Sequence, residues 1–143
     1  MPNTKAVGVA YSDPEFESVT VTGAVAATGA ITGASVSVTG ALNGTMLDLN
    51  APVTKTTSFT LGDTENFVVC NGAGSITVTV PTAAANTGRL VWIKTIAAQT
   101  VVSASSNVKP ISSGTAGTAI LAASAGAWAM LVCDGTDWVV MAS

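Results

Sequence analysis

The residues best suited to chemistry in this sequence are two pairs of carboxylates. Asp134 and Asp137 flank Gly135-Thr136, and Asp63 lies two residues before Glu65. Paired carboxylates can hydrolyse glycosides, one as general acid and the other as base or nucleophile. Both pairs lie in sequences that are typical of β-turns. We therefore interpret them as turn residues, and an enzyme acting on polysaccharide is the least supported class of function.

The rest of the sequence offers no other catalytic or ligand-binding pattern. The chain contains no histidine, which removes the commonest general base and every Ser-His or Cys-His nucleophile pair. The turn aspartates do not form the Asp-x-Asp-x-Asp-Gly loop of a calcium site. Gly72-Ala73-Gly74 lacks the third glycine and the helix of a dinucleotide site. We expect no enzymatic activity, no metal and no cofactor.

The surface of the protein must be built largely from small, uncharged side chains. Only 9% of the residues are charged and 48% are hydrophobic, whereas about 25% of an average soluble domain is charged. Such a surface is suited to burial against copies of the same chain. The five basic residues are scattered and the net charge is −3. No basic patch is available for phosphates, so we expect no nucleic acid partner.

One uncharged segment has the length of a membrane span. No charge occurs between Glu17 and Asp48, but residues 18–47 contain ten Ser, Thr or Asn and five Gly, which disfavours a membrane helix. The opening residues are not followed by an apolar core and a cleavage site, so we expect no secretory signal and assembly in a cytosol. Cys70 and Cys133 are then expected to be buried thiols, with a disulfide as the alternative.

The sequence pattern predicts an all-β protein with three regions. No window has the apolar spacing of a helix, whereas β-branched residues alternate with small polar residues throughout. Residues 1–18 are predicted to be an extended arm, in which Asp13, Glu15 and Glu17 share one side of a strand-like segment. A solvated acidic tail is the alternative interpretation of this arm.

Residues 19–45 are predicted to form a short shaft. Thr-Gly-Ala occurs four times, at 22–24, 28–30, 32–34 and 39–41, and this spacing of about six residues suits a β-helix with glycine at its corners. One chain would complete too few coils to be stable, so we expect three chains to wind together as a homotrimer. A flexible linker is the alternative. The candidate axis residues are Val21, Val25, Ile31, Val38 and Leu42.

Residues 46–55 are predicted to be a junction, and residues 56–143 a β-sandwich of jelly-roll type. The alternation of Ile76, Val78 and Val80 with polar neighbours predicts one buried and one solvated face. Segment 127–133 is apolar on both faces, which places it centrally or at a subunit contact. The predicted strands are 56–61, 66–70, 75–80, 89–95, 99–103, 118–122, 127–133 and 137–142.

The three tryptophans all lie in these predicted strands. Trp92, Trp128 and Trp138 are expected to anchor the domain core or a subunit contact, because tryptophan in a strand more often packs than binds a ligand. With one Tyr and three Phe in the whole chain, an aromatic sugar-binding surface would be small. A ligand platform remains the alternative for these residues.

Three segments carry a family resemblance: GRLVWIK at 88–94, WAMLVCDGTDW at 128–138, and AVGVAYSDP at 6–14. The first two resemble the small β-domain that ends many tailed-bacteriophage fibre and capsid-decoration proteins. The third resembles the virion-anchoring arm of short head proteins, and the Thr-Gly-Ala repeats are similar to trimeric fibre shafts. The anchoring residues on the arm would be Val7, Val9, Tyr11, Asp13, Pro14 and Phe16.

The resemblance implies a homotrimer on a virion, assembled in the bacterial cytoplasm, with its arm on the major capsid protein. The short shaft and small tip favour a head fibre or cement protein over a tail fibre. The alternative is a short adhesin that binds a host surface glycan or protein through the C-terminal domain, for example through loop 103–117.

Overall fold

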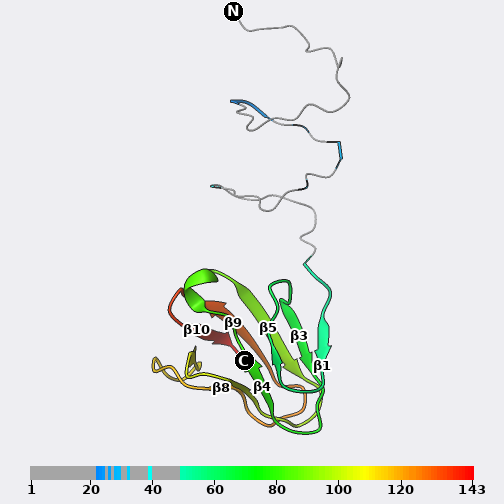
Figure 1. Ribbon diagram of the computed structural model, residues 1–143, viewed down its shortest axis with the longest axis vertical. Coiled ribbons are helices and arrows are strands. Elements are labelled where there is room, and N and C mark those ends of the chain that lie inside the picture. The colour runs from blue at the N-terminus through cyan, green and yellow to red at the C-terminus, as the bar shows by residue number, and fades with distance from the viewer. Residues whose placement is uncertain (1–21, 25, 27, 30–31, 33–38, 40–48) are drawn as a thin grey trace, which may run out of the picture. The chain divides into compact units, whose positions relative to one another are not determined.

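A computed structural model describes residues 22–24, 26, 28–29, 32, 39 and 49–143 (Figure 1). The predicted arm, all of its candidate anchoring residues and all five candidate axis residues lie outside the described residues. Among the described residues the only helical element is a 3-10 turn at Ala83–Ala85, and the regular structure is otherwise β. None of the described segments forms a helix long and apolar enough to cross a membrane.

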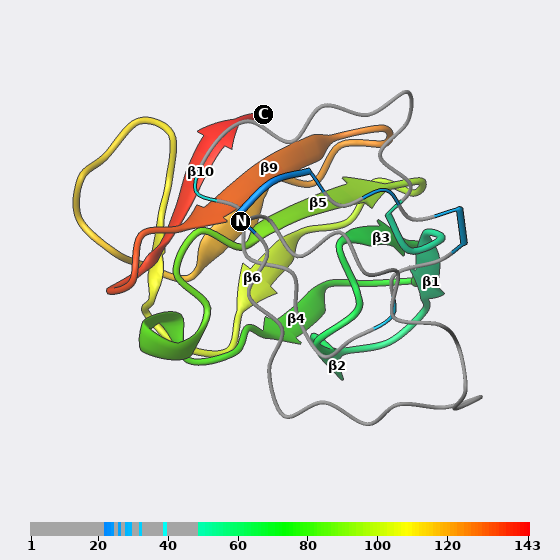
Figure 2. The ribbon, with the colours of Figure 1, turned by 90° about the horizontal axis from the view of Figure 1, so that it is seen from above.

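Residues 49–143 form two mixed β-sheets. The larger sheet has six strands in the order β1-β3-β5-β9-β10-β7, and the smaller has four in the order β2-β4-β6-β8. Figure 2 shows the strands of each sheet side by side. The strands are β1 (Val53–Lys55), β2 (Phe59–Thr60), β3 (Phe67–Cys70), β4 (Ile76–Thr79), β5 (Leu90–Thr95), β6 (Val101–Ser103), β7 (Val108–Lys109), β8 (Ala119–Leu121), β9 (Trp128–Cys133) and β10 (Trp138–Ala142).

The first six strands alternate between the two sheets, and each runs parallel to the preceding strand of its own sheet. In the six-stranded sheet β1 is parallel to β3 and β3 to β5, and in the smaller sheet β2 is parallel to β4 and β4 to β6. Successive passes are also joined at their corners, where Asn71 N–H donates to Lys55 O at 2.8 Å and Ile96 N–H to Cys70 O at 3.0 Å. The chain therefore coils three times through the two layers.

The last four strands complete the sheets in a different way. Strand β9 is antiparallel to β5 and β10 is antiparallel to β9, while β8 is antiparallel to β6 and β7 is parallel to β10. The jelly-roll prediction is wrong, because a jelly roll is built from antiparallel strands and five of the strand pairs here are parallel. The coarser prediction of a β-domain built from two sheets is confirmed.

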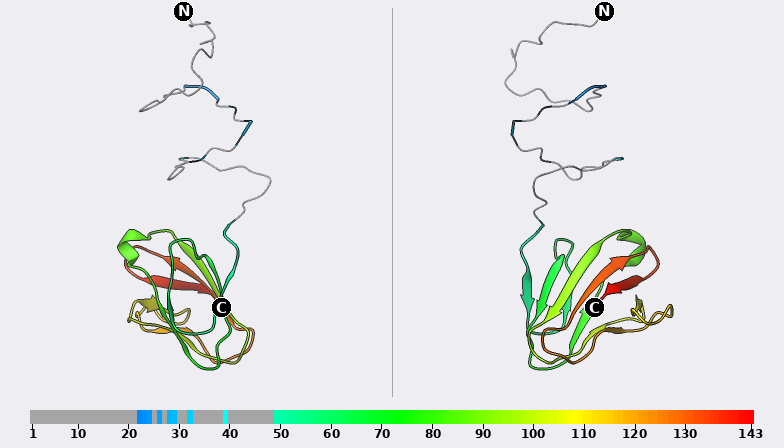
Figure 3. Two further views of the ribbon diagram at one scale, coloured as in Figure 1. Left: turned by 45° about the vertical axis from the view of Figure 1, so that its right-hand side comes forward. Right: turned by 180° about the vertical axis from the view of Figure 1, so that it is seen from behind.

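The core is built from buried residues of both sheets, whose strands are drawn in Figure 3. Side chains alternate along each strand, so that Val91 and Ile93 of β5 are fully buried and face the core together with their register partners on β9, Leu131 and Ala129. Ile76 and Val78 of β4 close the core from the other sheet. This alternation confirms the buried face predicted for residues 75–80. Burial of this kind contributes about 25 cal/mol per Å² of apolar surface.

Two short strands were not predicted. Strand β1 occupies residues expected to be a junction, and β7 lies within the expected loop 103–117. Both are edge strands of the six-stranded sheet, and strands of two or three residues give a weak alternation signal. The predicted strand 56–61 is reduced to Phe59–Thr60. The other seven predicted strands are all present.

Both cysteines are buried, free thiols, as predicted. Cys70 ends β3 and Cys133 ends β9, on strands that are separated by β5. Burial raises the pKa of the Cys70 thiol to about 11, and the Cys133 thiol donates to Ala83 O. Because the thiolate is the reactive form, the Cys70 side chain is inert at neutral pH.

Candidate functional site

The carboxylate pair at 134 and 137 is held in a turn, as predicted. Asp134 Oδ1 accepts from the backbone N–H of Asp137 at 2.7 Å and of Thr136 at 2.8 Å, and this turn joins the antiparallel strands β9 and β10. Lys109 Nζ lies 3.1 Å from Asp134 Oδ2 and 3.0 Å from Asp137 Oδ2. The hydrogen bonds from Asp137 and Thr136, followed by that from Lys109, lower the pKa of Asp134 to about 2. Both carboxylates thus stabilise the hairpin.

The second pair also lies in a turn, as predicted, but this turn connects the two sheets and is not part of a hairpin. Residues 61–66 lead from β2 in one sheet to β3 in the other. Glu65 Oε2 accepts from Gly62 N–H at 2.9 Å, and Glu65 Oε1 pairs with Lys55 Nζ. The Gly62 hydrogen bond and then the Lys55 ion pair lower the pKa of Glu65. Among residues 49–143 and the few described residues before them, no group of three potential metal ligands occurs.

The Asp134 turn predicts a loss of stability in acid. Because its pKa in the folded state is about 2, below the unfolded value of about 3.9, Asp134 stabilises the fold above about pH 4 and loses this contribution as the pH falls towards 2. We expect the urea midpoint to fall over this range, and to fall less for Asp134→Asn, which keeps the oxygen acceptor. Asp63→Asn, at an exposed turn residue, is the control. Equal pH profiles for Asp134→Asn and wild type would contradict the assignment.

The most unusual surface in the described chain is the outer face of the six-stranded sheet, hereafter the outer face. Strand register places its side chains in three rows, one across β5, β9 and β10 and two across β3, β5 and β9. The rows share large apolar side chains, which on these strands alternate with the buried core residues. The rows are Leu90 with Val132 and Val139; Phe67 with Trp92 and Met130; and Val69 with Lys94 and Trp128.

The smaller sheet provides an internal comparison. Its outward residues are mainly threonine, since Thr60 pairs with Thr79, and Thr77 with Val102. A sheet with one face on the core and one in water normally alternates apolar and polar residues in this way. The low charge of the chain therefore does not explain the outer face of the larger sheet. The central strands of the larger sheet carry apolar side chains on both sides, although only the side that faces the core is covered by other described residues.

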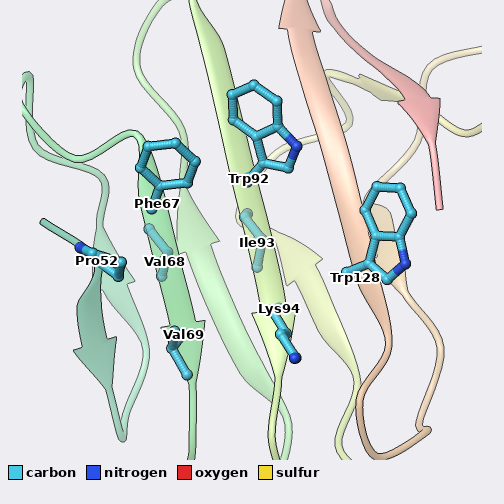
Figure 4. A pocket seen from close by; sticks show the side chains of 8 residues that line it. All are labelled: Pro52, Phe67, Val68, Val69, Trp92, Ile93, Lys94 and Trp128. Atoms are coloured by element: carbon cyan, nitrogen blue, oxygen red, sulfur yellow. The ribbon is translucent and has the colours of Figure 1, made fainter. Parts of the chain in front are cut away.

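The outer face contains a shallow groove of about 290 Å³ (Figure 4). Figure 4 shows Phe67, Trp92 and Trp128 on three adjacent strands of this face. The rings of Phe67 and Trp92 stack with their centroids 5.2 Å apart and an interplanar angle of 18°. Pro52, just before β1, closes the groove at one end, and Lys94 brings the one charge.

The structure separates the three tryptophans. Trp138 is 0% exposed and belongs to the core, and its Nε1–H donates to Pro81 O at 3.0 Å. Trp92 is half-buried, and Trp128 is 45% exposed. Trp138 thus lies in the core, one of the two roles predicted for the tryptophans, whereas Trp92 and Trp128 lie on the outer face, where a subunit contact stays a prediction.

Sequence reasoning identified only part of this face. Segment 127–133 was recognised as apolar on both sides, and β9 is indeed a central strand of the sheet. The same signal is present in Phe67-Val68-Val69-Cys70 and in Leu90-Val91-Trp92-Ile93, where no polar residue separates the apolar ones. Applied to those two runs, it would have identified Phe67, Val69 and Leu90.

Comparison with known proteins gives no further guide to function. No family model, no curated protein and no solved structure matches this chain. Function must therefore be inferred from the chemistry of the outer face and from the sequence.

Proposed function

We propose that this chain is a non-enzymatic structural protein of a bacteriophage virion. It acts as a homotrimeric capsid decoration or head-fibre protein on the capsid surface, and its N-terminal region binds the major capsid protein. The observation that carries this proposal is the apolar outer face. A sheet face with rows of Phe, Trp, Leu, Val and Met is typical of a surface that becomes buried in an assembly.

Two further observations support a structural role over a catalytic one. Three of the four carboxylates that suggested glycoside hydrolysis, those of Glu65, Asp134 and Asp137, are engaged by Lys55, Lys109 or backbone N–H groups. The two thiols are buried. The resemblance of segments 88–94 and 128–138 to the terminal domains of phage fibre and decoration proteins supplies the virion as the setting.

The proposal is tested by locating the chain on intact particles with cryo-electron microscopy. We expect trimers on the icosahedral head, with residues 1–18 on the shell. Deletion of residues 1–18 is expected to abolish capsid binding and leave the trimer intact, because the arm binds the shell and not the other copies. The proposal is contradicted if the truncated chain still binds capsids, or if the chain is absent from intact particles.

The second candidate is a short tail fibre or adhesin that binds a host glycan or surface protein through its C-terminal domain. The aromatic side chains of Phe67, Trp92 and Trp128 on one face favour it, because sugar rings stack on exposed aromatic rings. Trimers found only on the tail, together with glycan-array binding that is lost in Trp128→Ala, would favour the adhesin. Normal adsorption of particles that lack the protein would count against it.

A further inference from the structure

We propose that the outer face of the six-stranded sheet is covered by the same face of other copies of this chain, so that the three sheets of the trimer enclose one axis. This inference rests on the proposed homotrimer and names the surface that holds the domains together. Its anchors are Trp92 and Met130 on the two central strands, with Phe67, Leu90 and Trp128 around them.

The polarity of the face specifies the chemistry of its partner. Large apolar side chains occupy most of its centre, where Lys94 of β5 is the one charged residue, and further polar residues lie towards the edge strands, with Thr54 beside Val69 on one side and Lys109 beside Val139 on the other. An apolar centre with a polar rim is the usual anatomy of a protein interface. A glycan needs several donors and acceptors, and on β3, β5 and β9 the outward side chains offer only donors, the Lys94 ammonium and the indole N–H groups of Trp92 and Trp128, and no oxygen acceptor.

Several large apolar side chains of the outer face are exposed to solvent in a single chain. Trp128 is 45% exposed, Leu90 is 40% exposed and Met141 is 56% exposed. These are large apolar side chains on neighbouring strands of one sheet, whereas the outward threonines of the smaller sheet need no cover. A second copy supplies an equally apolar surface, and identical faces around a symmetry axis meet in equivalent positions.

The size of the face agrees with a subunit contact. The 26 residues of its six strands, at about 3.3 Å per residue and about 4.8 Å between strands, give a footprint of roughly 400 Å². Side chains that stand on the sheet raise the accessible area towards the roughly 800 Å² that each partner buries in a standard interface.

A charge placed on the outer face tests the proposal in the full-length chain. Trp128→Glu should raise the dissociation constant of the trimer at least about 30-fold, as expected for the loss of a binding hot spot. Thr79→Glu, at an exposed outward position of the smaller sheet, should leave it unchanged. The measurement is native mass spectrometry or light scattering over a dilution series.

Cysteine cross-linking reports the same contact even if the upstream repeats hold the trimer together. The native thiols at 70 and 133 are buried, so a cysteine introduced by Met130→Cys is the accessible one. We expect a short bismaleimide to link Met130→Cys chains into dimers, and not to link Thr79→Cys or wild-type chains.

The outcomes separate this inference from the proposed function. Cross-linking through position 130 supports the inference. The inference is overturned if Met130→Cys chains do not cross-link and Trp128→Glu has the same oligomer mass as wild type. It is also overturned if the chain is monomeric and an added glycan protects the outer face from the maleimide reagent. The virion assignment is tested separately, by the presence of the chain on particles and by the loss of capsid binding when residues 1–18 are deleted.

Discussion

Replacing Trp138 with alanine is expected to lower the free energy of unfolding by about 3–5 kcal/mol, the usual loss for a buried Trp or Phe. Trp138 is fully buried between the sheets, next to Cys133 of β9 and Val108 of β7 in the strand register. The truncation leaves a cavity, and it also leaves Pro81 O without the 3.0 Å hydrogen bond from the indole. Because typical domains are stable by about 5–15 kcal/mol, this one change approaches the limit of foldability.

Two matched variants separate the causes of this loss. Trp138→Phe keeps most of the ring and loses the N–H group, so we expect about 1–2 kcal/mol, the cost of an unpaired carbonyl with a small cavity. Trp128→Ala removes the same side chain from the outer face and should cost under about 1 kcal/mol in a monomeric chain. The measurement is unfolding in urea, monitored by circular dichroism. At chain concentrations low enough for the chain to be monomeric, similar losses for Trp128→Ala and Trp138→Ala would contradict the assignment of Trp138 to the core.

The positions of the strands could be predicted, but their connections could not. Alternation and turn residues are local signals, and they located β3, β4, β5 and β9 to within one or two residues. Whether a turn returns the chain to the adjacent strand or carries it to the other sheet depends on distant partners. The turns at 62–65 and 134–137 have similar sequences, yet only the second is a hairpin, with Gly135 at a φ of +94°.

Once the register of the hairpin turn is known, strand alternation tells which face of the sheet each tryptophan side chain occupies. Trp128 and Cys133 are five residues apart on β9, so their side chains point to opposite faces. Trp138 is paired with Cys133 across the hairpin, which directs it into the core. The sequence alone does not reveal this pairing, because a shift of one residue in the hairpin would exchange the two faces. A strand with apolar residues on both faces has no polar side to mark the solvent face, so its sequence does not set the register.

The coiled path of the chain brings other atoms so close to Gly72 that we expect no side chain to fit there. Gly72→Ala should lower the free energy of unfolding by about 1–3 kcal/mol, as for other overpacked sites. A Cβ atom at Gly72 would lie 2.7 Å from Thr56 O and 3.2 Å from Ile76 Cδ1. The Gly72 N–H also donates to the buried side chain of Gln99 at 2.9 Å. Thr56, Gly72 and Gln99 follow β1, β3 and β5, so three successive passes of the chain meet at this corner.

Gly74, two residues further along the same turn, provides the matched control. No atom lies within 4 Å of a Cβ placed there, and its φ is not positive. Gly74→Ala should therefore leave the stability unchanged or raise it by about 0.4–1 kcal/mol, because alanine reduces the freedom of the unfolded chain. Both variants are measured by urea unfolding. Since the clash at Gly72 is with a backbone carbonyl and not with a flexible side chain, equal midpoints for the two variants would mean that the passes do not stack as described.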